Sequence, residues 1–316
     1  MFALVIDDGA LAWRERPDPV PGPGDVVVEV AAAGLNAADL LQRRGLYPAP
    51  PGVPADVPGL ELAGRVTAVG GGVDASWRGR RVAALTGGGA QATRCVVPVE
   101  HLLEVPEGVE FVEAAGFPEA FCTAHDALVT QGALGAGERL LVTGAAGGVG
   151  CAAVQIGRAL GASVVALTRD ARHHEALAAL GADETVVAND LAGIEPVDVV
   201  LELVGAATLP TALSRTGPFG RIVVVGVGSG PRVELDLLRV MGARLTLTGS
   251  TLRSRTRAEK AEVVARVAAD LGSRWREGAL RVPVAEVVDA RDATRAYDAF
   301  ARPGKLGKVV LAVGSR

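Results

Sequence analysis

The sequence contains few lysines and no long apolar run. Only Lys260, Lys305 and Lys308 are lysines among its 32 basic residues, and its formal net charge is −4. This slightly acidic balance offers no basic surface for nucleic acid or for an anionic membrane. No stretch of about 18 apolar residues without a charge is present, so a membrane-spanning helix is not expected.

Cysteine usage and the N-terminal segment bear on the compartment. Cys95, Cys122 and Cys151 lie far apart and form no Cys-x-x-Cys pair. A disulfide framework or a structural zinc site is therefore not expected, and we interpret the three residues as small and buried. The N-terminal segment reaches Asp7 and Asp8 before any long apolar core, which is not typical of a signal peptide. We expect a soluble, cytoplasmic protein.

The chain of 316 residues is long enough for two domains, each with its own core. Its first third is rich in glycine and proline and contains short β-type runs at residues 26–30, 64–69 and 80–85. Closely spaced short strands between turn residues predict a compact β-rich domain.

The middle of the chain alternates strands with helices. The expected strands cover residues 139–143, 163–167, 197–201 and 221–225, and the expected helices cover 149–160 and 171–180. Because these strands are unbroken apolar runs, the pattern predicts a parallel sheet that is covered on both faces.

The last part of the chain has β character again. We expect helices at 257–271 and 292–301, strand-like residues at 282–284 and a final strand at 308–311. The sequence therefore predicts an α/β protein in which a Rossmann domain with a doubly wound parallel sheet, residues 121–256, is inserted in a β-rich catalytic domain, residues 1–120 and 257–316. The active site is expected in the cleft between the two domains.

A glycine-rich loop lies directly between an expected strand and an expected helix. It consists of Gly144, Ala145, Ala146, Gly147, Gly148, Val149 and Gly150. Glycines allow the backbone to turn tightly and to approach a diphosphate, whose charge is stabilised by the N–H groups that begin the helix. The spacing is Gly-x-x-Gly-x-x-Gly, and its position after a strand favours a dinucleotide site over an ordinary turn.

The end of the second expected nucleotide-domain strand indicates which dinucleotide binds. A domain that prefers NAD places an acidic residue there to bind the ribose hydroxyls, whereas this chain has Thr168 and Arg169, followed by Arg172. Guanidinium groups match a 2′-phosphate in charge and geometry, so we predict NADPH as the cofactor. Asp170 lies close by and would repel that phosphate, and exposed arginines at a helix start are common.

Several segments resemble the quinone oxidoreductases of the medium-chain dehydrogenase/reductase superfamily. They cover essentially the whole chain in order, at residues 34–40, 45–48, 58–64, 144–150, 248–255 and 304–310. The segment at 248–255 resembles the subgroup that contains the p53-inducible quinone oxidoreductase. The resemblance implies a GroES-like catalytic domain and a Rossmann domain that binds NADPH.

Zinc-dependent relatives carry a cysteine where this chain has Asn36, a histidine where it has Leu60, and a third ligand near Glu119. Asparagine and leucine side chains cannot replace a thiolate and an imidazole, so no catalytic metal is expected. Reduction of a conjugated acceptor needs only hydride from the nicotinamide, positioning and a few hydrogen bonds. We therefore predict zinc-free reduction of quinones, with reduction of 2-alkenals or other activated enones as the alternative.

The resemblance also implies roles for individual residues. Asn36, Asp39 and Tyr47 would lie near the nicotinamide and the substrate, although asparagine and aspartate also cap helices and the tyrosine can be a packing residue. Cofactor contacts are expected from Thr123, Gly205, Gly226 and Lys308. Many relatives have a tyrosine after the third nucleotide-domain strand that helps to hold the 2′-phosphate. This chain has Ala188 there, which leaves more of that task to Arg169.

Residues 243–248 alternate apolar and polar side chains and are expected to form an edge strand. Unpaired edges invite partner strands, and the resemblance implies pairing of this edge across a two-fold axis, so we predict a homodimer. A protein that binds the nucleotide without catalysis is the alternative from another functional class.

Overall fold

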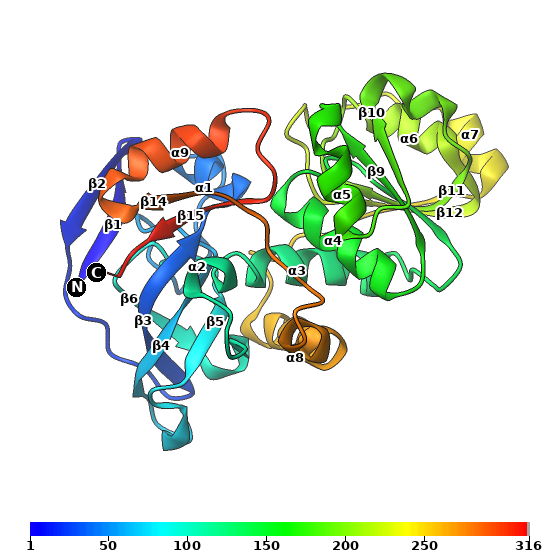
Figure 1. Ribbon diagram of the computed structural model, residues 1–316. Coiled ribbons are helices and arrows are strands. Elements are labelled where there is room, and N and C mark those ends of the chain that lie inside the picture. Colours follow the sequence, from blue (N-terminus) through cyan, green and yellow to red (C-terminus); the bar gives the residue numbers. More distant parts are fainter. Residues whose placement is uncertain (315–316) are drawn as a thin grey trace. The chain divides into compact units, whose positions relative to one another are not determined.

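The computed structural model describes residues 1–314, and the chain divides into two compact units. One unit comprises Met1–Cys122 together with the segment from Leu252 onward, and the other comprises Thr123–Thr251 (Figure 1). We expected the boundaries after residues 120 and 256. The structure places them after Cys122 and Thr251.

The first unit contains a seven-stranded sheet in the order β14-β15-β3-β4-β5-β7, with β6 paired to β3. The strands are β3 (Asp25–Gly34), β4 (Glu61–Val69), β5 (Arg81–Leu85), β6 (Arg94–Pro98), β7 (Leu102–Glu104), β14 (Val284–Asp289) and β15 (Lys308–Ala312). β15 pairs antiparallel with the end of β3, which confirms that the last strand returns to the first unit. β14 begins later than the expected strand at 282–284.

The core of this sheet is built by apolar side chains of the long strand β3. Val26, Val28 and Val30 are buried, and they point to the same face because side chains alternate along a strand. Helix α9 (Ala293–Ala301) packs on β14 and β15 and buries Tyr297, whose hydroxyl donates a 2.9 Å hydrogen bond to Oε1 of Gln91.

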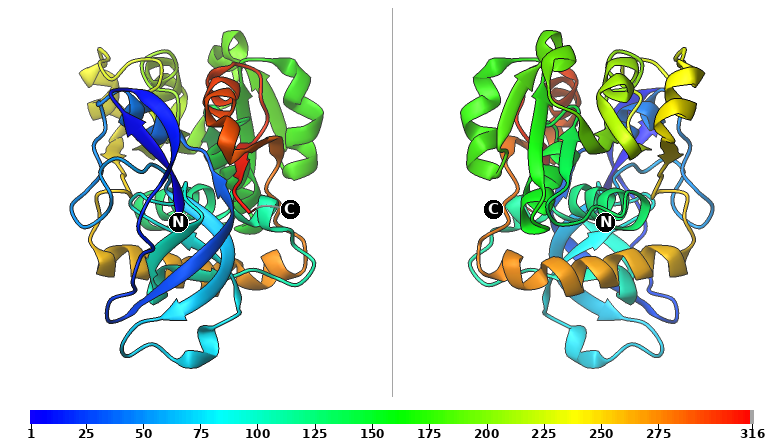
Figure 2. Two further views of the ribbon diagram at one scale, coloured as in Figure 1. Left: turned by 90° about the vertical axis from the view of Figure 1, so that its left-hand side faces the viewer. Right: turned by 90° about the vertical axis from the view of Figure 1, so that its right-hand side faces the viewer.

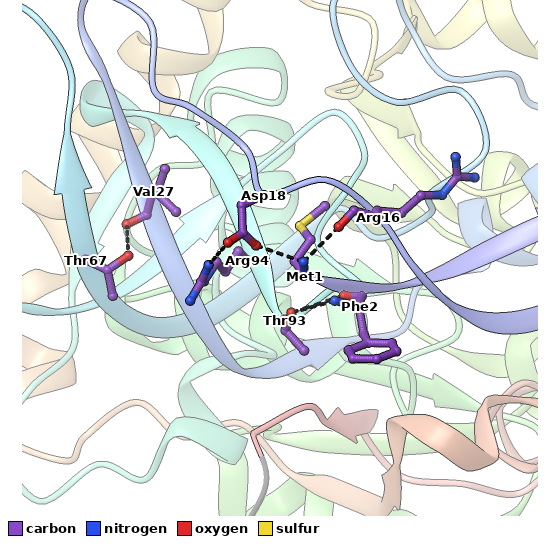
Figure 3. A network of polar contacts seen from close by, with 8 residues as sticks. All are labelled: Met1, Phe2, Arg16, Asp18, Val27, Thr67, Thr93 and Arg94. Atoms are coloured by element: carbon purple, nitrogen blue, oxygen red, sulfur yellow. Dashed lines mark hydrogen bonds and ion pairs between the residues drawn. The ribbon is translucent and has the colours of Figure 1, made fainter.

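A hairpin of β1 (Phe2–Asp7) and β2 (Ala10–Glu15) is attached to the loop before β6 (Figure 3). The backbone N–H of Phe2 donates to Oγ1 of Thr93 at 3.0 Å, and the Thr93 hydroxyl donates back to the Phe2 carbonyl at 3.2 Å. The carboxylate of Asp18 forms ion pairs with both Arg94 and the amino group of Met1. These contacts fix the hairpin beside the sheet.

Four further α-helices lie among the described residues of the first unit. They are α1 (Ala37–Arg43), α2 (Phe111–Ala114), α3 (Pro118–His125), which continues into the second unit, and α8 (Arg257–Arg276). α8 is seen along its length in Figure 2, and it begins with a reciprocal cap in which Thr256 and Glu259 bond each other's backbone N–H groups. No helix among residues 1–314 is both long enough and apolar enough to cross a membrane.

The second unit is a six-stranded parallel sheet in the order β10-β9-β8-β11-β12-β13. Its strands are β8 (Arg139–Val142), β9 (Ser163–Thr168), β10 (Glu184–Val187), β11 (Val197–Glu202), β12 (Thr216–Val224) and β13 (Thr246–Gly249). β8, β9 and β11 are almost entirely buried, as expected for strands covered on both faces. This arrangement confirms the predicted Rossmann-like sheet.

Helices cover both faces of this sheet. α4 (Gly148–Ala159) and α5 (His174–Leu180) lie on one face, and α6 (Leu209–Arg215) and α7 (Leu237–Ala243) lie on the other (Figures 1 and 2). The strand order reverses between β8 and β11, because right-handed connections proceed in opposite directions from these two central strands. Ligands of such sheets bind at the carboxyl ends of the strands beside that reversal.

The expected strand at 243–248 is partly wrong. Ala243 ends α7, and Arg244 closes that helix in a left-handed conformation with φ of 55°. The strand therefore begins only at Thr246, and it pairs with β12 alone.

Candidate active site

The glycine-rich loop connects β8 to α4 at the carboxyl end of the second unit's sheet. Gly144 has φ of 62°, a conformation that favours glycine, and Gly147 is the N-cap of α4. A Cβ atom on Gly150 would lie 2.5 Å from the carbonyl oxygen of Gly144 and 2.6 Å from Cα of Ala145. Of the three glycines in the Gly-x-x-Gly-x-x-Gly spacing, Gly144 is thus required by the turn and Gly150 by close packing.

The start of α4 provides backbone N–H groups for an anion. The first N–H groups of a helix have no partner within the helix, and the helix dipole adds positive charge there. Gly148 and Val149 lie in this first turn and are half-buried, as is Ala146 before it. This geometry fits the diphosphate of a dinucleotide.

The end of β9 presents a free arginine. Thr168 is buried, and its hydroxyl donates to the carbonyl of Asp170 at 3.0 Å. The carboxylate of Asp170 binds Arg172. The hydrogen bonds from Arg172 lower the pKa of the Asp170 carboxyl to about 2. Arg169 is exposed, and within the described part of the chain no residue forms a hydrogen bond or ion pair with it. The structure therefore separates the two arginines that we grouped: only Arg169 has an uncommitted guanidinium group.

Glu202, the last residue of β11, organises the neighbouring loop and was missed by sequence reasoning. It is fully buried, and its Oε1 accepts hydrogen bonds from the hydroxyls of Thr143 at 2.8 Å and Thr208 at 2.9 Å. The same oxygen accepts from the backbone N–H groups of Val204 at 2.7 Å and Gly205 at 2.8 Å. This carboxylate therefore fixes the loop that follows β11, beside the glycine-rich loop.

Gly205 and Gly226 both have packing reasons to be glycine. Gly205 has φ of 100°, and a Cβ on it would lie 2.8 Å from the carbonyl oxygen of Gly230. A Cβ on Gly226 would lie 2.3 Å from the carbonyl oxygen of Leu203. A close approach of a neighbouring backbone segment explains each glycine, and the contact of these two residues with a cofactor stays a prediction.

Thr123 is buried, and its hydroxyl has no hydrogen-bond partner within residues 1–314. A buried hydroxyl that lacks a partner costs about 1–3 kcal/mol. A ligand atom that bonds this hydroxyl would remove the cost. The open N–H groups of α4, the free Arg169 and this hydroxyl are the observations on which the second unit fits a dinucleotide.

In the first unit, three polar side chains from distant parts of the sequence form a buried cluster. The ammonium group of Lys308 lies 2.5 Å from Oε1 of Glu61 and donates to Oδ1 of Asn36 at 2.7 Å. Nδ2 of Asn36 donates to the same Glu61 oxygen at 3.0 Å. A Cβ on Gly34 would lie 2.4 Å from that oxygen, which explains the glycine two residues before Asn36.

The observed partners of Lys308 are side-chain and backbone oxygens of the protein, whereas we expected Lys308 to contact the cofactor. Its ammonium donates to three oxygens, those of Asn36 and Glu61 and the carbonyl of Leu35 at 2.8 Å, and the side chain is 3% exposed. An ammonium group has three N–H donors, so none is left for a nucleotide. The structure thus gives Lys308 a role in holding the first unit together at Asn36 and Glu61, and its contact with a cofactor stays a prediction.

Asp39 is also more internal than we expected. It is 0% exposed, and its two oxygens accept from the backbone N–H groups of Asn36 at 2.8 Å and Gly59 at 3.1 Å. Burial raises the pKa of Asp39 to about 6. These contacts fix the start of α1, so Asp39 has a capping role, and a place for it near the substrate stays a prediction.

Tyr47 lies half-buried in the loop after α1, and Arg253 holds it in place. The Arg253 guanidinium carbon lies 4.9 Å from the centre of the Tyr47 ring, and Nη1 donates to the Tyr47 carbonyl at 2.9 Å. The same guanidinium donates to Oε1 of Gln42 at 2.6 Å and to the carbonyl of Gly87 at 3.0 Å. One face of the ring is thus covered by a cation, which the electron-rich ring face attracts. Sequence reasoning did not find Arg253 as the partner of this tyrosine.

Glu119 lies on α3 beside this cluster. Its backbone N–H donates to Oε2 of Glu61 at 2.9 Å. Aromatic stacking holds this part of the chain. The centre of the Phe117 ring lies 4.0 Å from that of Phe121 and 3.9 Å from that of Trp275. Burial, and then the nearby Glu61 carboxylate, raise the pKa of Glu119 to about 8.

Two family descriptions match consecutive parts of the chain. Residues 22–107 match the alcohol dehydrogenase GroES-like domain, and residues 148–269 match the zinc-binding dehydrogenase. The quinone oxidoreductase of Pseudomonas aeruginosa is 34% identical over 98% of both chains. The human synaptic vesicle membrane protein VAT-1 homolog is 32% identical over 98% of this chain and 84% of its own. The chain belongs to the medium-chain dehydrogenase/reductase superfamily.

Solved structures of the superfamily agree with the fold of this oxidoreductase. A mycobacterial protein in complex with NADPH covers 99% of this chain and all of its own, with a TM-score of 0.86 and 28% identity. An NAD-dependent alcohol dehydrogenase has the same coverage, TM-score and identity. The predicted combination of a GroES-like domain with a Rossmann-like sheet is thereby confirmed.

The zinc site of the superfamily does not fit the residues of this chain. Asn36 and Leu60 offer an amide and an alkyl group, neither of which replaces a thiolate or an imidazole ligand. The Glu61 carboxylate is paired with the ammonium of Lys308, which also binds Asn36. A positive charge is therefore already present beside these two side chains. Within residues 1–314, no group of three or more His, Cys, Asp or Glu side chains is arranged to hold a metal ion.

Proposed function

We propose that this oxidoreductase uses NADPH to reduce quinones by hydride or electron transfer, without zinc. The observation that carries the proposal is the binding of Asn36 and Glu61 by Lys308, because this cluster offers hydrogen bonds and no ligand set for a Lewis acid. Alcohol oxidation needs such an acid or a base for the alkoxide, whereas a quinone accepts electrons without one. The similarity to a bacterial quinone oxidoreductase over 98% of both chains supports the choice of acceptor.

Each residue has a defined task in this proposal. The bound cofactor supplies a hydride equivalent from its nicotinamide. The N–H groups at the start of α4 hold its diphosphate, and Arg169 holds its 2′-phosphate. Asn36 donates a hydrogen bond to an acceptor carbonyl, and Tyr47, whose ring is held by Arg253, contacts a flat acceptor.

NADPH oxidation by the purified protein tests the function. A naphthoquinone, an ortho-quinone and a 2-alkenal are compared at equal concentration, with the loss of NADPH absorbance as the readout. We expect at least one quinone to be reduced faster than the alkenal. Faster turnover of the alkenal would favour the alternative, a reductase of activated C=C bonds. NADPH binding without oxidation by any acceptor would favour a catalytically silent protein, and turnover that depends on added zinc would overturn the proposal.

Arg169→Ala is expected to weaken NADPH binding and to leave NADH binding nearly unchanged. Arg169 is exposed and uncommitted, so its guanidinium is available for the 2′-phosphate that NADH lacks. Loss of a charge-assisted hydrogen bond costs about 1.5–3 kcal/mol, which corresponds to a Kd that is about 10- to 150-fold higher. Titration calorimetry with each cofactor measures the change.

NADH is the internal control for the same variant, because a distorted loop would weaken both cofactors equally. Arg169→Lys keeps the charge without the planar fork and is expected to lie between the wild type and Arg169→Ala. Equal losses for NADPH and NADH would remove Arg169 from the phosphate site.

We also propose that the protein is a homodimer joined at β13 and α7. β13 is an edge strand whose outer backbone groups have no neighbouring strand in the described chain. The adjacent helix α7 exposes large apolar side chains: Leu237 is 67%, Leu238 78% and Met241 71% exposed. An open edge beside an apolar surface is a feature that soluble proteins normally cover with a partner.

The double substitution Leu238→Glu/Met241→Glu is expected to convert the dimer to a monomer. Two carboxylates on each protomer, buried in an apolar interface, would cost several kcal/mol. Size-exclusion chromatography with light scattering measures the mass. Val20→Glu is the control, since Val20 is 84% exposed in the other unit and should leave the dimer intact. A monomeric wild type would contradict the proposal.

A further inference from the structure

The cluster of Lys308, Asn36 and Glu61 determines which way the Asn36 amide faces. An ammonium group can only donate hydrogen bonds, so the atom of Asn36 that lies 2.7 Å from Lys308 Nζ must be the carbonyl oxygen. A carboxylate can only accept, so the atom that lies 3.0 Å from Glu61 Oε1 must be the amide nitrogen. The opposite orientation of the amide would place its N–H groups against the Lys308 ammonium and its oxygen against the Glu61 carboxylate.

One N–H of Asn36 is left over in this arrangement. The amide nitrogen carries two N–H groups, and only one of them is used by Glu61. No other residue of the described chain accepts from it. Asn36 is 9% exposed, compared with 3% for Lys308 and 0% for Glu61, so it is the most exposed of the three residues in this cluster.

We propose that Lys308 is a positioning residue that replaces the metal of zinc-dependent relatives: its buried ammonium locks the Asn36 amide so that one N–H is presented to the carbonyl oxygen of the acceptor. The inference rests on the proposed function, in which an acceptor carbonyl binds at Asn36. In the reaction the acceptor gains a hydride equivalent from NADPH and a proton from water. The Asn36 N–H bonds the carbonyl oxygen as negative charge develops on it.

The cation itself does not contact the acceptor, because all three of its N–H groups are used inside the cluster. Its positive charge also compensates the Glu61 carboxylate, which would otherwise oppose negative charge on the acceptor. Removal of Lys308 therefore has two effects in the same direction. The amide can rotate and present its carbonyl oxygen, and the carboxylate is left without its counter-charge.

A double-mutant cycle with Lys308→Met and Asn36→Ala tests the inference. Asn36→Ala is expected to lower kcat/KM for the acceptor about 100-fold, as for loss of a donor to a developing oxyanion. Lys308→Met is expected to lower it about tenfold. The loss in the double variant should be smaller than the product of the two single losses, because the part of the lysine's effect that acts through Asn36 disappears once Asn36 is gone. If the loss of kcat/KM in the double variant equals the product of the two single losses, the inference is overturned.

Two further measurements separate positioning from a general loss of structure. The Kd for NADPH should be unchanged in Lys308→Met, because the glycine-rich loop belongs to the other unit. Lys305→Met is the matched control: Lys305 donates to the carbonyl of Phe300, away from the cluster, and its loss should leave kcat/KM unchanged. An effect of Lys305→Met as large as that of Lys308→Met would also overturn the inference.

If Lys308→Met does not fold, the wild type still provides a test. In protein with nitrogen-15 in its asparagine side chains, the Asn36 signal is assigned by its loss in Asn36→Ala. A non-reducible acceptor analogue should shift one of the two amide protons and leave the other, which is bonded to Glu61, in place. Equal shifts of both protons would contradict a locked amide. If alkenals rather than quinones are reduced, the proposed acceptor is wrong, yet the same cycle can be measured with an alkenal.

Discussion

Glu202→Ala is expected to lower the free energy of unfolding by about 3–5 kcal/mol and to weaken cofactor binding. The carboxylate is fully buried and accepts hydrogen bonds from two hydroxyls and two backbone N–H groups. Alanine would leave these donors without an acceptor at the carboxyl end of β11. Urea unfolding followed by circular dichroism measures the stability, and NADPH titration measures the effect on the site.

Glu202→Gln is the matched control for this prediction. All four donors bond Oε1, and only the Thr208 hydroxyl also reaches Oε2, at 3.0 Å. A glutamine can keep the oxygen at Oε1 and turn its amide nitrogen toward the Thr208 hydroxyl, which can accept. The loss should then be about 1 kcal/mol. Equal losses for alanine and glutamine would show that the negative charge, rather than the shared acceptor, is what the loop requires.

The parts of the site that are local in sequence could be predicted. The glycine-rich loop is read from seven consecutive residues, and its flanking strand and helix follow from apolar runs on either side. The position of Arg169 at the end of β9 follows in the same way, whereas only the structure shows that Arg172 is paired with Asp170 and Arg169 is not paired with any described residue. Such segments could be predicted because the apolar runs and the glycine spacing that define them lie within a few consecutive residues.

The buried cluster of the first unit could not be predicted in the same way. Lys308 and Asn36 are 272 positions apart, and they meet only because β15 pairs with the end of β3. A lysine near the C-terminus resembles a surface or nucleotide contact until the partners of its ammonium are known. Arg253 and Tyr47, 206 positions apart, were missed for the same reason. Long-range polar pairs leave no periodic signal in the sequence.

Glu119→Gln is expected to remove a loss of stability that the wild type shows as the pH rises. Burial, together with the Glu61 carboxylate, raises the pKa of Glu119 in the folded state to about 8, from an ordinary value of 4.5. A raised pKa means that the folded state binds the proton more tightly than the unfolded state does. The stabilisation is therefore complete below the unfolded pKa of 4.5 and is lost as the pH rises through about 8.

The pH window can be chosen so that Glu119 dominates. Asp39 changes stability in the same direction, but its folded pKa of about 6 confines its effect to lower pH. The pKa of His101 is lowered by burial, so its effect also lies below neutrality. From about pH 6 to about pH 8 the wild type should lose about 2 kcal/mol relative to Glu119→Gln, since one proton changes stability by about 1.4 kcal/mol per pH unit and partial exposure reduces this.

Urea unfolding at both pH values, for the wild type, Glu119→Gln and the control Glu107→Gln, measures this difference. Glu107 is exposed, so its substitution should leave the pH dependence of the wild type unchanged. Parallel pH profiles for the wild type and Glu119→Gln would mean that Glu119 is already ionised in the folded protein. In that case Lys308 and Lys260, whose charges favour the ionised form, would outweigh burial and the repulsion by Glu61.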